Sequence, residues 1–421
     1  MDADFDVVVV GSGPAGATAA ILLGRAGLTV ALLEAHKNPE HYKRLCTHSI
    51  RSSATPTLRR LGLDQLLDGL NAVHHRENGW SKRGWIHERP DAEHGYNIRR
   101  VTLDPALRAV AANTPGVELV MGAKVRDLIT DADDRITGVD AEIGGGRRHF
   151  GSRLVIGADG YRSTVAELAD LPGKFSTNTR FGYQAGYLNV GMPSGWSGAG
   201  WMQEPDANLN YVFCNNDGLA MLAVFHVKTG LADFKQDREG ALLRTFASLT
   251  DGPDLSEAER VTDVIGTTDY PSVTRRRIVR LGVALIGDAA MVGDPAWGTG
   301  CGWAFQSAEW LGDAIADPLR SGSDEEVDAG GRRYQRKHRM KLLPHQAVNV
   351  DFGRRTSLSP LNKLVYGAAP HDRKVADRMF AVATRSSSPA TLFDPVLLTR
   401  ALIVARKATS RGSSKPVTDR A

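Results

Sequence analysis

Apolar residues near the start of the chain fall into a short run, a longer run and another short run. We expect a buried strand over Asp4–Val10, an alanine- and leucine-rich helix over Ala15–Ala26, and a second strand over Leu28–Glu34. The loop Gly11–Gly16 joins the first strand to the helix. Strand, loop, helix and strand in this order predict a βαβ unit of the dinucleotide-binding type.

The pattern changes in the middle of the chain. Helices are expected over 52–70 and 101–112, and a strand meander over 123–157. Apolar and polar residues then alternate in stretches rich in aromatic residues, which predicts antiparallel strands such as Phe181–Val190, Asn210–Cys214 and Leu219–Val227. A buried strand at Arg280–Ile286, a helix at Gly300–Ala316 and several helices within 331–405 complete the prediction.

These elements predict an α/β protein with a discontinuous dinucleotide-binding domain. Residues 1–72, 98–170 and 273–330 would form that domain, and residues 73–97 and 171–272 a substrate domain with an antiparallel sheet. A C-terminal helical region is expected over 331–408, followed by a disordered tail over 409–421.

Composition excludes several classes of protein. Of the 421 residues, 42% are hydrophobic, yet no apolar run reaches the roughly 20 residues of a membrane span. The acidic first residues lead directly into a strand, so no secretion signal is expected. Cys46, Cys214 and Cys301 lie far apart and lack metal-ligand spacing, which predicts reduced thiols in the cytoplasm and no metal site.

Charge is distributed unevenly along the chain. Residues 331–421 contain 19 Lys and Arg against 5 Asp and Glu, although the net charge of the whole chain is only +4. A basic segment of this kind can attract an acidic carrier protein or a reductase, whereas a solvated helical face with a loose tail is the simpler interpretation. No nucleic-acid-binding motif accompanies the charge, so we expect no nucleic-acid partner.

The first loop fits the dinucleotide fingerprint. Gly11 makes the tight turn, Gly13 lets the backbone approach a pyrophosphate, and Gly16, next to Ala15, lets the helix pack on the strand. Glu34, followed by Ala35, ends the second strand, where an acid can bind the ribose hydroxyls of the adenosine. A bound dinucleotide is therefore expected here.

Two later loops also follow buried strands. Asp159 lies in Gly157-Ala-Asp-Gly160, and Asp288 follows Gly287 at the end of the strand over 280–286. Each aspartate could bind sugar or ribityl hydroxyls, or could simply cap a turn. A run rich in proline and glycine then opens a helix and could place backbone N–H groups beside a reduced flavin; its residues are Pro295, Trp297, Gly298, Gly300, Cys301 and Gly302.

The order of the three loops resembles that of the flavin monooxygenases with the p-hydroxybenzoate hydroxylase fold, which flavin-dependent halogenases and geranylgeranyl reductases share. The resemblance implies a Rossmann-type FAD-binding domain of that fold, with Asp288 at the ribityl chain and Asp159 near the pyrophosphate. It also places Arg100 and, with a looser alignment, Arg44 at the cofactor, and adds Val125 to the residues that bind it.

The sequence departs from the family pattern in three places. Met291 stands where the family usually has a histidine after Gly-Asp-Ala-Ala, and no Trp-x-Trp-x-Ile-Pro segment of the tryptophan halogenases is present. No second glycine fingerprint is present either. NAD(P)H would therefore bind transiently as the electron donor, or a separate reductase would supply the electrons.

The resemblance implies a monooxygenase that inserts one oxygen atom from O2, by hydroxylation or epoxidation through a flavin C4a-hydroperoxide. Its substrate would be a hydrophobic, aromatic or polycyclic small molecule of natural product biosynthesis. The flavin performs the chemistry, so no catalytic side chain is assigned, although His48 and Cys301 are worth testing. The candidate substrate pocket comprises Pro295, Trp297, Trp201, Tyr211, Phe213 and Phe225. A reductase or dehydrogenase resembling geranylgeranyl reductases, a halogenase and a flavoprotein without turnover are the alternatives.

Overall fold

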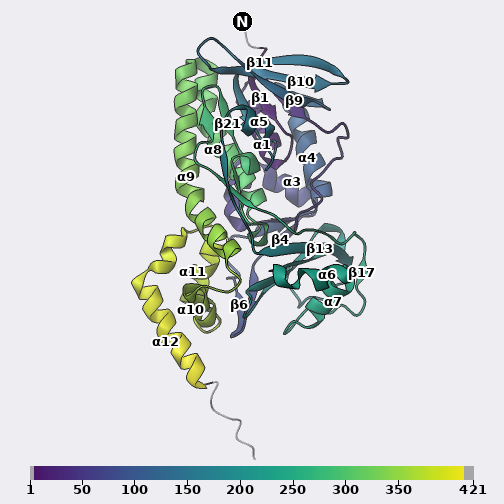
Figure 1. Cartoon of the computed structure of the whole chain (residues 1–421), viewed down its shortest axis with the longest axis vertical. Coiled ribbons are helices and arrows are strands. Elements are labelled where there is room, and N and C mark those ends of the chain that lie inside the picture. Colours follow the sequence, from purple (N-terminus) through teal and green to yellow (C-terminus); the bar gives the residue numbers. More distant parts are fainter. Residues whose placement is uncertain (1–3, 412–421) are drawn as a thin grey trace, which may run out of the picture.

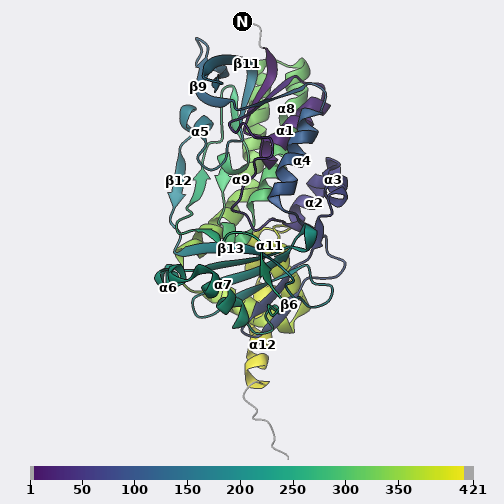
Figure 2. The same cartoon turned by 90° about the vertical axis from the view of Figure 1, so that its right-hand side faces the viewer.

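The computed structural model describes residues 4–411. Two parts lie end to end along the longest axis of the molecule (Figure 1). One part contains the N-terminal βαβ unit and a mixed sheet, and the other contains an antiparallel sheet with the C-terminal helices beside it (Figure 2). The α/β class, the additional antiparallel sheet and the C-terminal helices agree with the prediction from the sequence.

The first sheet has parallel central strands in the order β21-β11-β1-β2-β8, with β20 antiparallel at one edge. Its strands are rich in valine, leucine and isoleucine because both faces are covered. Strands β9 and β10 continue from β11 as the expected antiparallel meander. The bounds are β1 (Phe5–Val10), β2 (Val30–Glu34), β8 (Val117–Met121), β9 (Lys124–Thr130), β10 (Ile136–Ile143), β11 (Gly146–Gly157), β20 (Val279–Arg280) and β21 (Val283–Leu285).

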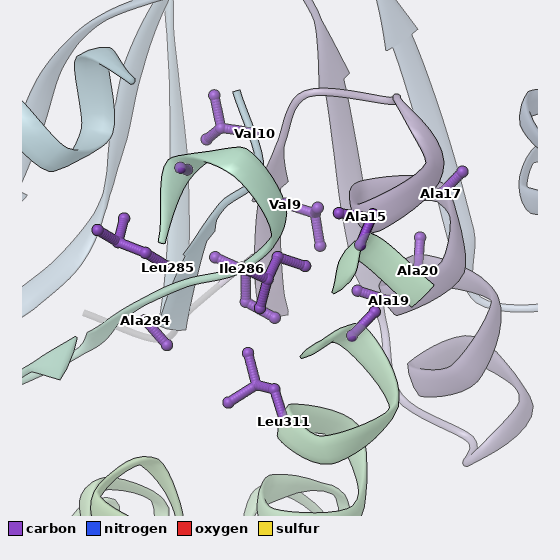
Figure 3. Packing of buried hydrophobic residues seen from close by; sticks show 14 of the residues in the cluster. Val9, Val10, Ala15, Ala17, Ala19, Ala20, Ala284, Leu285, Ile286 and Leu311 are labelled. Atoms are coloured by element: carbon purple, nitrogen blue, oxygen red, sulfur yellow. The ribbon is translucent and has the colours of Figure 1, made fainter. Parts of the chain in front are cut away.

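Helices α1 (Pro14–Arg25) and α8 (Gly300–Ser321) pack together beside β1 and the end of β21. Figure 3 shows Ala15 and Ala19 of α1 close to Val9, Ile286 and Leu311. The small alanine side chains let α1 approach its neighbours closely. Because β1, β2, β11 and β21 are parallel, the loops that follow them meet at one edge of the sheet, where ligands bind in open α/β sheets.

The segment expected as one helix over 52–70 is divided. The short helices α2 (Thr55–Arg60) and α3 (Leu63–Gly69) are separated at Gly62, whose backbone is left-handed with φ 65°. Glycine adopts this conformation without the steric cost of a Cβ, so the chain turns there. Helix α4 (Arg100–Ala112) then forms where the sequence predicts it.

The second sheet has the order β17-β13-β16-β15-β14-β5-β6, and β18 also pairs with β13. Strands β5 and β6 come from residues 78–87, and β5 joins the sheet by parallel pairing with β14. The bounds are β5 (Asn78–Ser81), β6 (Gly84–His87), β13 (Arg180–Leu188), β14 (Gly198–Gln203), β15 (Asn208–Cys214), β16 (Ala220–Val227), β17 (Glu259–Arg260) and β18 (Ile265–Thr267).

The two faces of this sheet contact different partners. Helices α6 (Leu231–Gln236) and α7 (Arg238–Ala247) cover one face through Phe234, Leu242 and Phe246. The other face contacts residues Ala296 and Trp297 of the first part. Two small sheets lie between the parts, β3-β7-β4 and β12-β19-β22; their strands are β3 (Ser49–Ile50), β4 (Val73–His75), β7 (Gly95–Asn97), β12 (Gly173–Ser176), β19 (Ser272–Arg275) and β22 (Met291–Val292).

The C-terminal region begins with one long helix, α9 (Asp324–Arg354), which starts at a capping box formed by Ser323 and Glu326. The expected boundary after residue 330 therefore lies inside a continuous helix. Gly330 faces α8 there, since a Cβ at this position would be 2.4 Å from the Ala314 carbonyl oxygen.

Helices α10 (Pro360–Ala368), α11 (Arg373–Ala383) and α12 (Pro395–Arg411) follow α9. Helix α12 extends to Arg411 and so includes the first residues of the tail expected over 409–421. The rest of that tail lies outside the described residues. Within residues 4–411, no helix is both long and apolar enough to cross a membrane.

Candidate active site

The loop between β1 and α1 has two glycines that packing requires and one that faces open space. A Cβ at Gly16 would be 1.8 Å from the Gly11 carbonyl oxygen, and a Cβ at Gly11 would be 2.6 Å from the Ala158 carbonyl oxygen. A Cβ at Gly13 would have no heavy atom within 4 Å. Gly13 is the N-cap of α1, so its open side lies where a helix N-terminus attracts an anion. This geometry fits the pyrophosphate of a dinucleotide.

Glu34 ends β2 beside the same loop and is only 9% exposed. Its Oε2 accepts hydrogen bonds from the backbone N–H (3.0 Å) and the hydroxyl (2.7 Å) of Ser12, and its Oε1 accepts one from the N–H of His36 (3.0 Å). Burial raises the pKa of Glu34, but these hydrogen bonds outweigh burial and lower it, so the group is a carboxylate. A carboxylate has about four acceptor positions, which leaves one for a ribose hydroxyl. Ala35 follows and is exposed.

Asp159 follows β11 and lies beside Gly11, but its side chain is used locally. Its Oδ1 accepts a hydrogen bond from the Ser163 hydroxyl (2.5 Å) and its Oδ2 from the Val165 N–H (3.0 Å). These bonds hold the start of helix α5 (Thr164–Leu168). The carboxylate of Asp159 therefore caps this turn, which is one of the two roles that the sequence left open. The backbone of Ala158 is the part of this segment that lies against the glycine loop.

Asp288 lies after β21 at the start of α8. A Cβ at Gly300 would be 3.6 Å from Asp288 Oδ1, and one at Gly287 would be 2.8 Å from the Ala15 side chain. The Asp288 side chain remains 24% exposed, so its oxygens are accessible to a ligand such as the ribityl chain.

Lys43, and not Arg44, is the cation at this aspartate. Lys43 Nζ lies 3.2 Å from Asp288 Oδ2, and Asp288 raises the pKa of Lys43. Arg44 pairs with Asp263 on the surface, with both side chains more than half exposed. The two neighbouring side chains leave the loop in different directions. The expected contact of Arg44 with the cofactor stays a prediction.

Arg100 is buried at the start of α4, with 5% of its surface exposed. Its Nε and Nη2 donate to the two carboxylate oxygens of Asp104 at 2.5 and 2.8 Å, and its Nη1 lies 3.9 Å from Cys301 Sγ. Asp104 also accepts a hydrogen bond from the Lys43 N–H (3.2 Å). The arginine is thus held in place between α4 and the start of α8.

Two thiols adjoin this arginine, and the sequence singled out only one of them. Cys46 and Cys301 are both free and share a hydrogen bond, which together with Arg100 holds the pKa of Cys46 well below its usual range despite burial. The same hydrogen bond and burial raise the pKa of Cys301. The N–H of His48 donates to Cys46 Sγ (3.3 Å), and burial lowers the pKa of His48, which stays neutral. Because 255 positions separate the two cysteines, the sequence alone does not indicate that they lie together.

The loop at Pro295–Trp297 is a single 3-10 turn fixed from both sides. Buried Asp294 caps it through the Ala296 N–H (2.9 Å), and the carbonyl oxygen of Trp297 accepts from Arg51 Nε (3.3 Å) and Arg385 Nη1 (3.4 Å). Gly298 follows with φ 59°, and a Cβ there would be 3.1 Å from Arg51 Nε. Gly302, in the first turn of α8, faces Ala54.

The substrate-pocket candidates separate into two groups. Tyr211 stacks on Phe213 at 5.5 Å between ring centroids, and both belong to the cluster that includes Trp297, Ala296 and Phe225. Trp201 belongs to the cluster on the opposite face of the sheet, where its Nε1 donates to the Thr250 carbonyl oxygen (3.0 Å). Its backbone pairs with Asn210, one residue before Tyr211, and successive residues of a strand face opposite sides. The expectation for Trp201 is wrong for this reason.

Sequence reasoning also missed a buried polar group next to this cluster. The Arg51 guanidinium pairs with Glu77 and lies 5.9 Å from the centre of the Phe213 ring. His75 Nε2 lies 3.3 Å from Glu77 Oε1, and burial and Arg51 lower the pKa of His75 to about 3. Among residues 4–411, no group of three or more His, Cys, Asp or Glu side chains is placed to hold a metal ion.

A model of the FAD binding domain family matches residues 4–340. The chain belongs to this FAD-binding family. Val125, which the resemblance adds to the cofactor residues, is buried in β9 opposite Ala141.

Two relatives align with most of the chain. It is 26% identical to a digeranylgeranylglycerophospholipid reductase of Methanothrix thermoacetophila over 383 residues, 87% of this chain and 92% of that protein. It is also 26% identical to the menaquinone reductase of Mycobacterium tuberculosis over 373 residues, 82% of this chain and 85% of that protein.

Among solved structures, p-nitrophenol 4-monooxygenase of Pseudomonas putida superposes with a TM-score of 0.72 at 19% identity, covering 92% of this chain and 100% of that one. Flavin-dependent halogenases share the fold as well. The fold is thus shared with monooxygenases and halogenases, the two aligned relatives are reductases, and this chain belongs to an FAD-dependent oxidoreductase family.

Proposed function

We propose that this protein is a reductase that uses FAD to add two hydrogen atoms to an unsaturated, apolar small molecule. The family resemblance in the sequence favours monooxygenation and leaves this activity as an alternative. The two relatives described above, which align over more than four fifths of the chain, are both reductases. The monooxygenase and halogenase neighbours are at most 20% identical, so their similarity supports the fold alone.

The observation that carries this proposal is the thiol pair at the start of α8. Reduction of a carbon–carbon double bond by hydride transfer leaves a carbon that must take up a proton, so a protein acid is needed. Cys46 and Cys301 share a hydrogen bond beside Arg100, and the raised pKa of Cys301 keeps a proton on the pair at neutral pH. Thiols are also readily oxidised, which makes them poor neighbours for oxygen-transfer chemistry.

The remaining residues have binding roles in this proposal. The Gly11–Gly16 loop and Glu34 hold the adenosine diphosphate end of FAD, and Asp288 with Lys43 holds its middle. Bound FAD supplies the hydride once an external electron donor such as NAD(P)H or a separate reductase has reduced it by two electrons. The cluster around Tyr211 and Phe213 excludes water from the space beside the Pro295–Trp297 turn.

A monooxygenase acting on a hydrophobic aromatic molecule, with NAD(P)H as electron donor, is the second candidate. The stacked pair Tyr211 and Phe213, packed with Trp297, favours it, because aromatic walls suit a flat aromatic substrate. No described feature favours halogenation over these two activities.

Oxygen dependence separates the two candidates. FAD-loaded enzyme would be reduced anaerobically with one equivalent of dithionite and mixed with a geranylgeranyl lipid, while flavin reoxidation and product mass are followed. A product that has gained two hydrogen atoms supports the reductase. A product that forms only in air and carries an oxygen atom from labelled O2 would overturn it in favour of the monooxygenase.

The thiol pair can be tested in the same assay. Cys46→Ser and Cys301→Ser should each lower the rate of substrate reduction by at least tenfold while flavin content stays unchanged. Cys214→Ser is the matched control, because Cys214 lies on β15 away from the pair. Equal rates in the three variants would remove the thiols from the mechanism.

A further inference from the structure

A cavity of about 590 Å³ lies near the Pro295–Trp297 turn, since Arg385 belongs to its wall and donates to the Trp297 carbonyl oxygen. Helices α2, α8, α9 and α11 line parts of it, and its walls include Ser53, Trp303, Trp310, His345, Phe380 and Arg385. Its volume falls within the range of small-molecule sites, roughly 300 to 1,000 Å³. Most of the lining residues are polar or charged, and Trp303, Trp310 and Phe380 add large apolar surfaces.

Arg385 is the unusual member of this wall. It has a left-handed backbone with φ 67°, and only its Nη1 has a partner, the Trp297 carbonyl oxygen at 3.4 Å. Its Nε and Nη2 are buried without a hydrogen-bond partner in the described part of the chain. Burial and the neighbouring Arg51 lower the pKa of Arg385. A buried cation without a counter-charge is costly, which indicates a missing anionic partner.

The acids on the cavity wall are engaged elsewhere. Glu88 accepts a hydrogen bond from the Glu77 N–H (2.9 Å), and Asp377 pairs with Arg373 (2.6 Å). Among residues 4–411, no carboxylate lies within 4.0 Å of the Arg385 guanidinium nitrogens. The chain itself therefore does not supply the partner.

Two further donors line the same cavity without a partner. The Trp303 indole N–H and the Ser53 hydroxyl are both buried and unbonded among the described residues. His345 is buried beside them, and burial and Arg385 lower its pKa to about 4, so the ring is neutral at physiological pH. The wall thus offers a cation and several donors, and calls for a ligand rich in acceptor oxygens.

We propose that this cavity binds an organic anion, with its carboxylate or phosphate at Arg385 and its apolar body against Trp303, Trp310 and Phe380. The site is coupled to the Pro295–Trp297 turn because Arg385 and Arg51 donate to the same carbonyl oxygen of Trp297. A ligand at Arg385 competes for the hydrogen bond that fixes this turn. The anion is either the far end of the substrate or a separate effector. The proposal does not depend on the reductase assignment.

Binding of 2-naphthoate to the FAD-loaded protein, measured by calorimetry, tests this site. We expect 2-naphthoate to bind at least tenfold more tightly than uncharged 2-naphthylmethanol, since charge-assisted hydrogen bonds are the stronger ones. Arg385→Met should weaken 2-naphthoate binding at least tenfold and leave 2-naphthylmethanol binding unchanged. Lys341→Met is the matched control, because Lys341 is an exposed cation on the same wall.

Three outcomes would overturn the proposal: equal affinity of wild type for the two probes, no binding of 2-naphthoate at millimolar concentration, or unchanged affinity in Arg385→Met. The first two need no variant, so the test survives a folding defect in Arg385→Met. Inhibition kinetics then show whether the bound anion is the far end of the substrate or a separate effector. If 2-naphthoate competes with the reducible substrate, the cavity is a substrate subsite. If both bind together, it is an effector site.

Discussion

Replacing Gly13 and Gly16 separately by alanine should distinguish cofactor binding from folding. Both residues belong to the same loop, but their surroundings differ. The new methyl group at residue 16 would overlap the Gly11 carbonyl oxygen at 1.8 Å, whereas at residue 13 it would meet no protein atom within 4 Å. Each variant therefore adds one methyl group to the same loop, at a crowded position in Gly16→Ala and at an open position in Gly13→Ala.

The expected magnitudes follow from these contacts. In Gly16→Ala the loop or helix must move by more than 1 Å, and we expect a loss of about 3 kcal/mol in the unfolding free energy of the apoprotein. Gly13 is an N-cap with φ −69° and ψ −176°, which alanine can adopt, so Gly13→Ala should cost only about 0.5 to 1 kcal/mol. Obstruction of one hydrogen bond to the charged pyrophosphate, about 1.5 to 3 kcal/mol, should weaken FAD binding by roughly 10- to 150-fold.

Two assays are needed. Urea unfolding of the apoproteins, followed by circular dichroism, gives the stability, and quenching of FAD fluorescence gives the dissociation constant. Gly13→Ala should lose affinity with little loss of stability, and Gly16→Ala should lose both. If Gly13→Ala binds FAD as wild type does, the pyrophosphate does not lie at this loop. If Gly13→Ala is destabilised as much as Gly16→Ala, the difference in packing between the two positions is refuted.

Three further predictions concern other residues. Lys43→Met should weaken FAD binding about tenfold because Asp288 loses its ion pair, whereas Arg44→Met should leave it unchanged; equal effects in titrations would contradict the assignment. Burial raises the pKa of Asp294 from 3.8 to about 6, so wild type should lose about 2 kcal/mol relative to Asp294→Asn as the pH rises from 4 to 6. A pH-independent difference in urea unfolding would refute this shift. Trp201→Phe should lower the unfolding free energy by about 1 to 2 kcal/mol and leave turnover intact. A loss of turnover without destabilisation would show that Trp201 contacts the substrate after all.

The fold could be predicted where local pattern and tertiary environment agree. The β1-α1-β2 unit combines apolar runs with glycines at the turn, and the strands of the second sheet alternate regularly, so both were found near their observed bounds. The predicted start of the C-terminal region, residue 331, falls inside helix α9, because the sequence does not show that Gly330 contacts α8. That contact depends on a neighbour whose position only the folded chain defines.

The site was predicted less completely, for a related reason. A motif identifies a loop, but the direction of each side chain depends on what packs beside it. The sequence therefore does not show that Lys43 pairs with Asp288 while Arg44 pairs with Asp263. The pairing of Cys46 with Cys301 and the isolation of Arg385 involve residues far apart in sequence. Without knowledge of which segments meet, each of these residues resembles an ordinary cysteine or surface cation.

The order of strands in the first sheet has a consequence for synthesis of the protein in the cell. Strand β21 pairs with β11 beside β1, but about 250 residues separate it from β2. At about 5 to 20 residues per second, a ribosome takes roughly 12 to 50 seconds to cross that interval. During this time the nascent chain presents β1, α1 and β2 without Asp288 or α8, so cofactor loading is a late event. Until β21 is made, the edge of β11 that it later covers stays open to pairing with other strands.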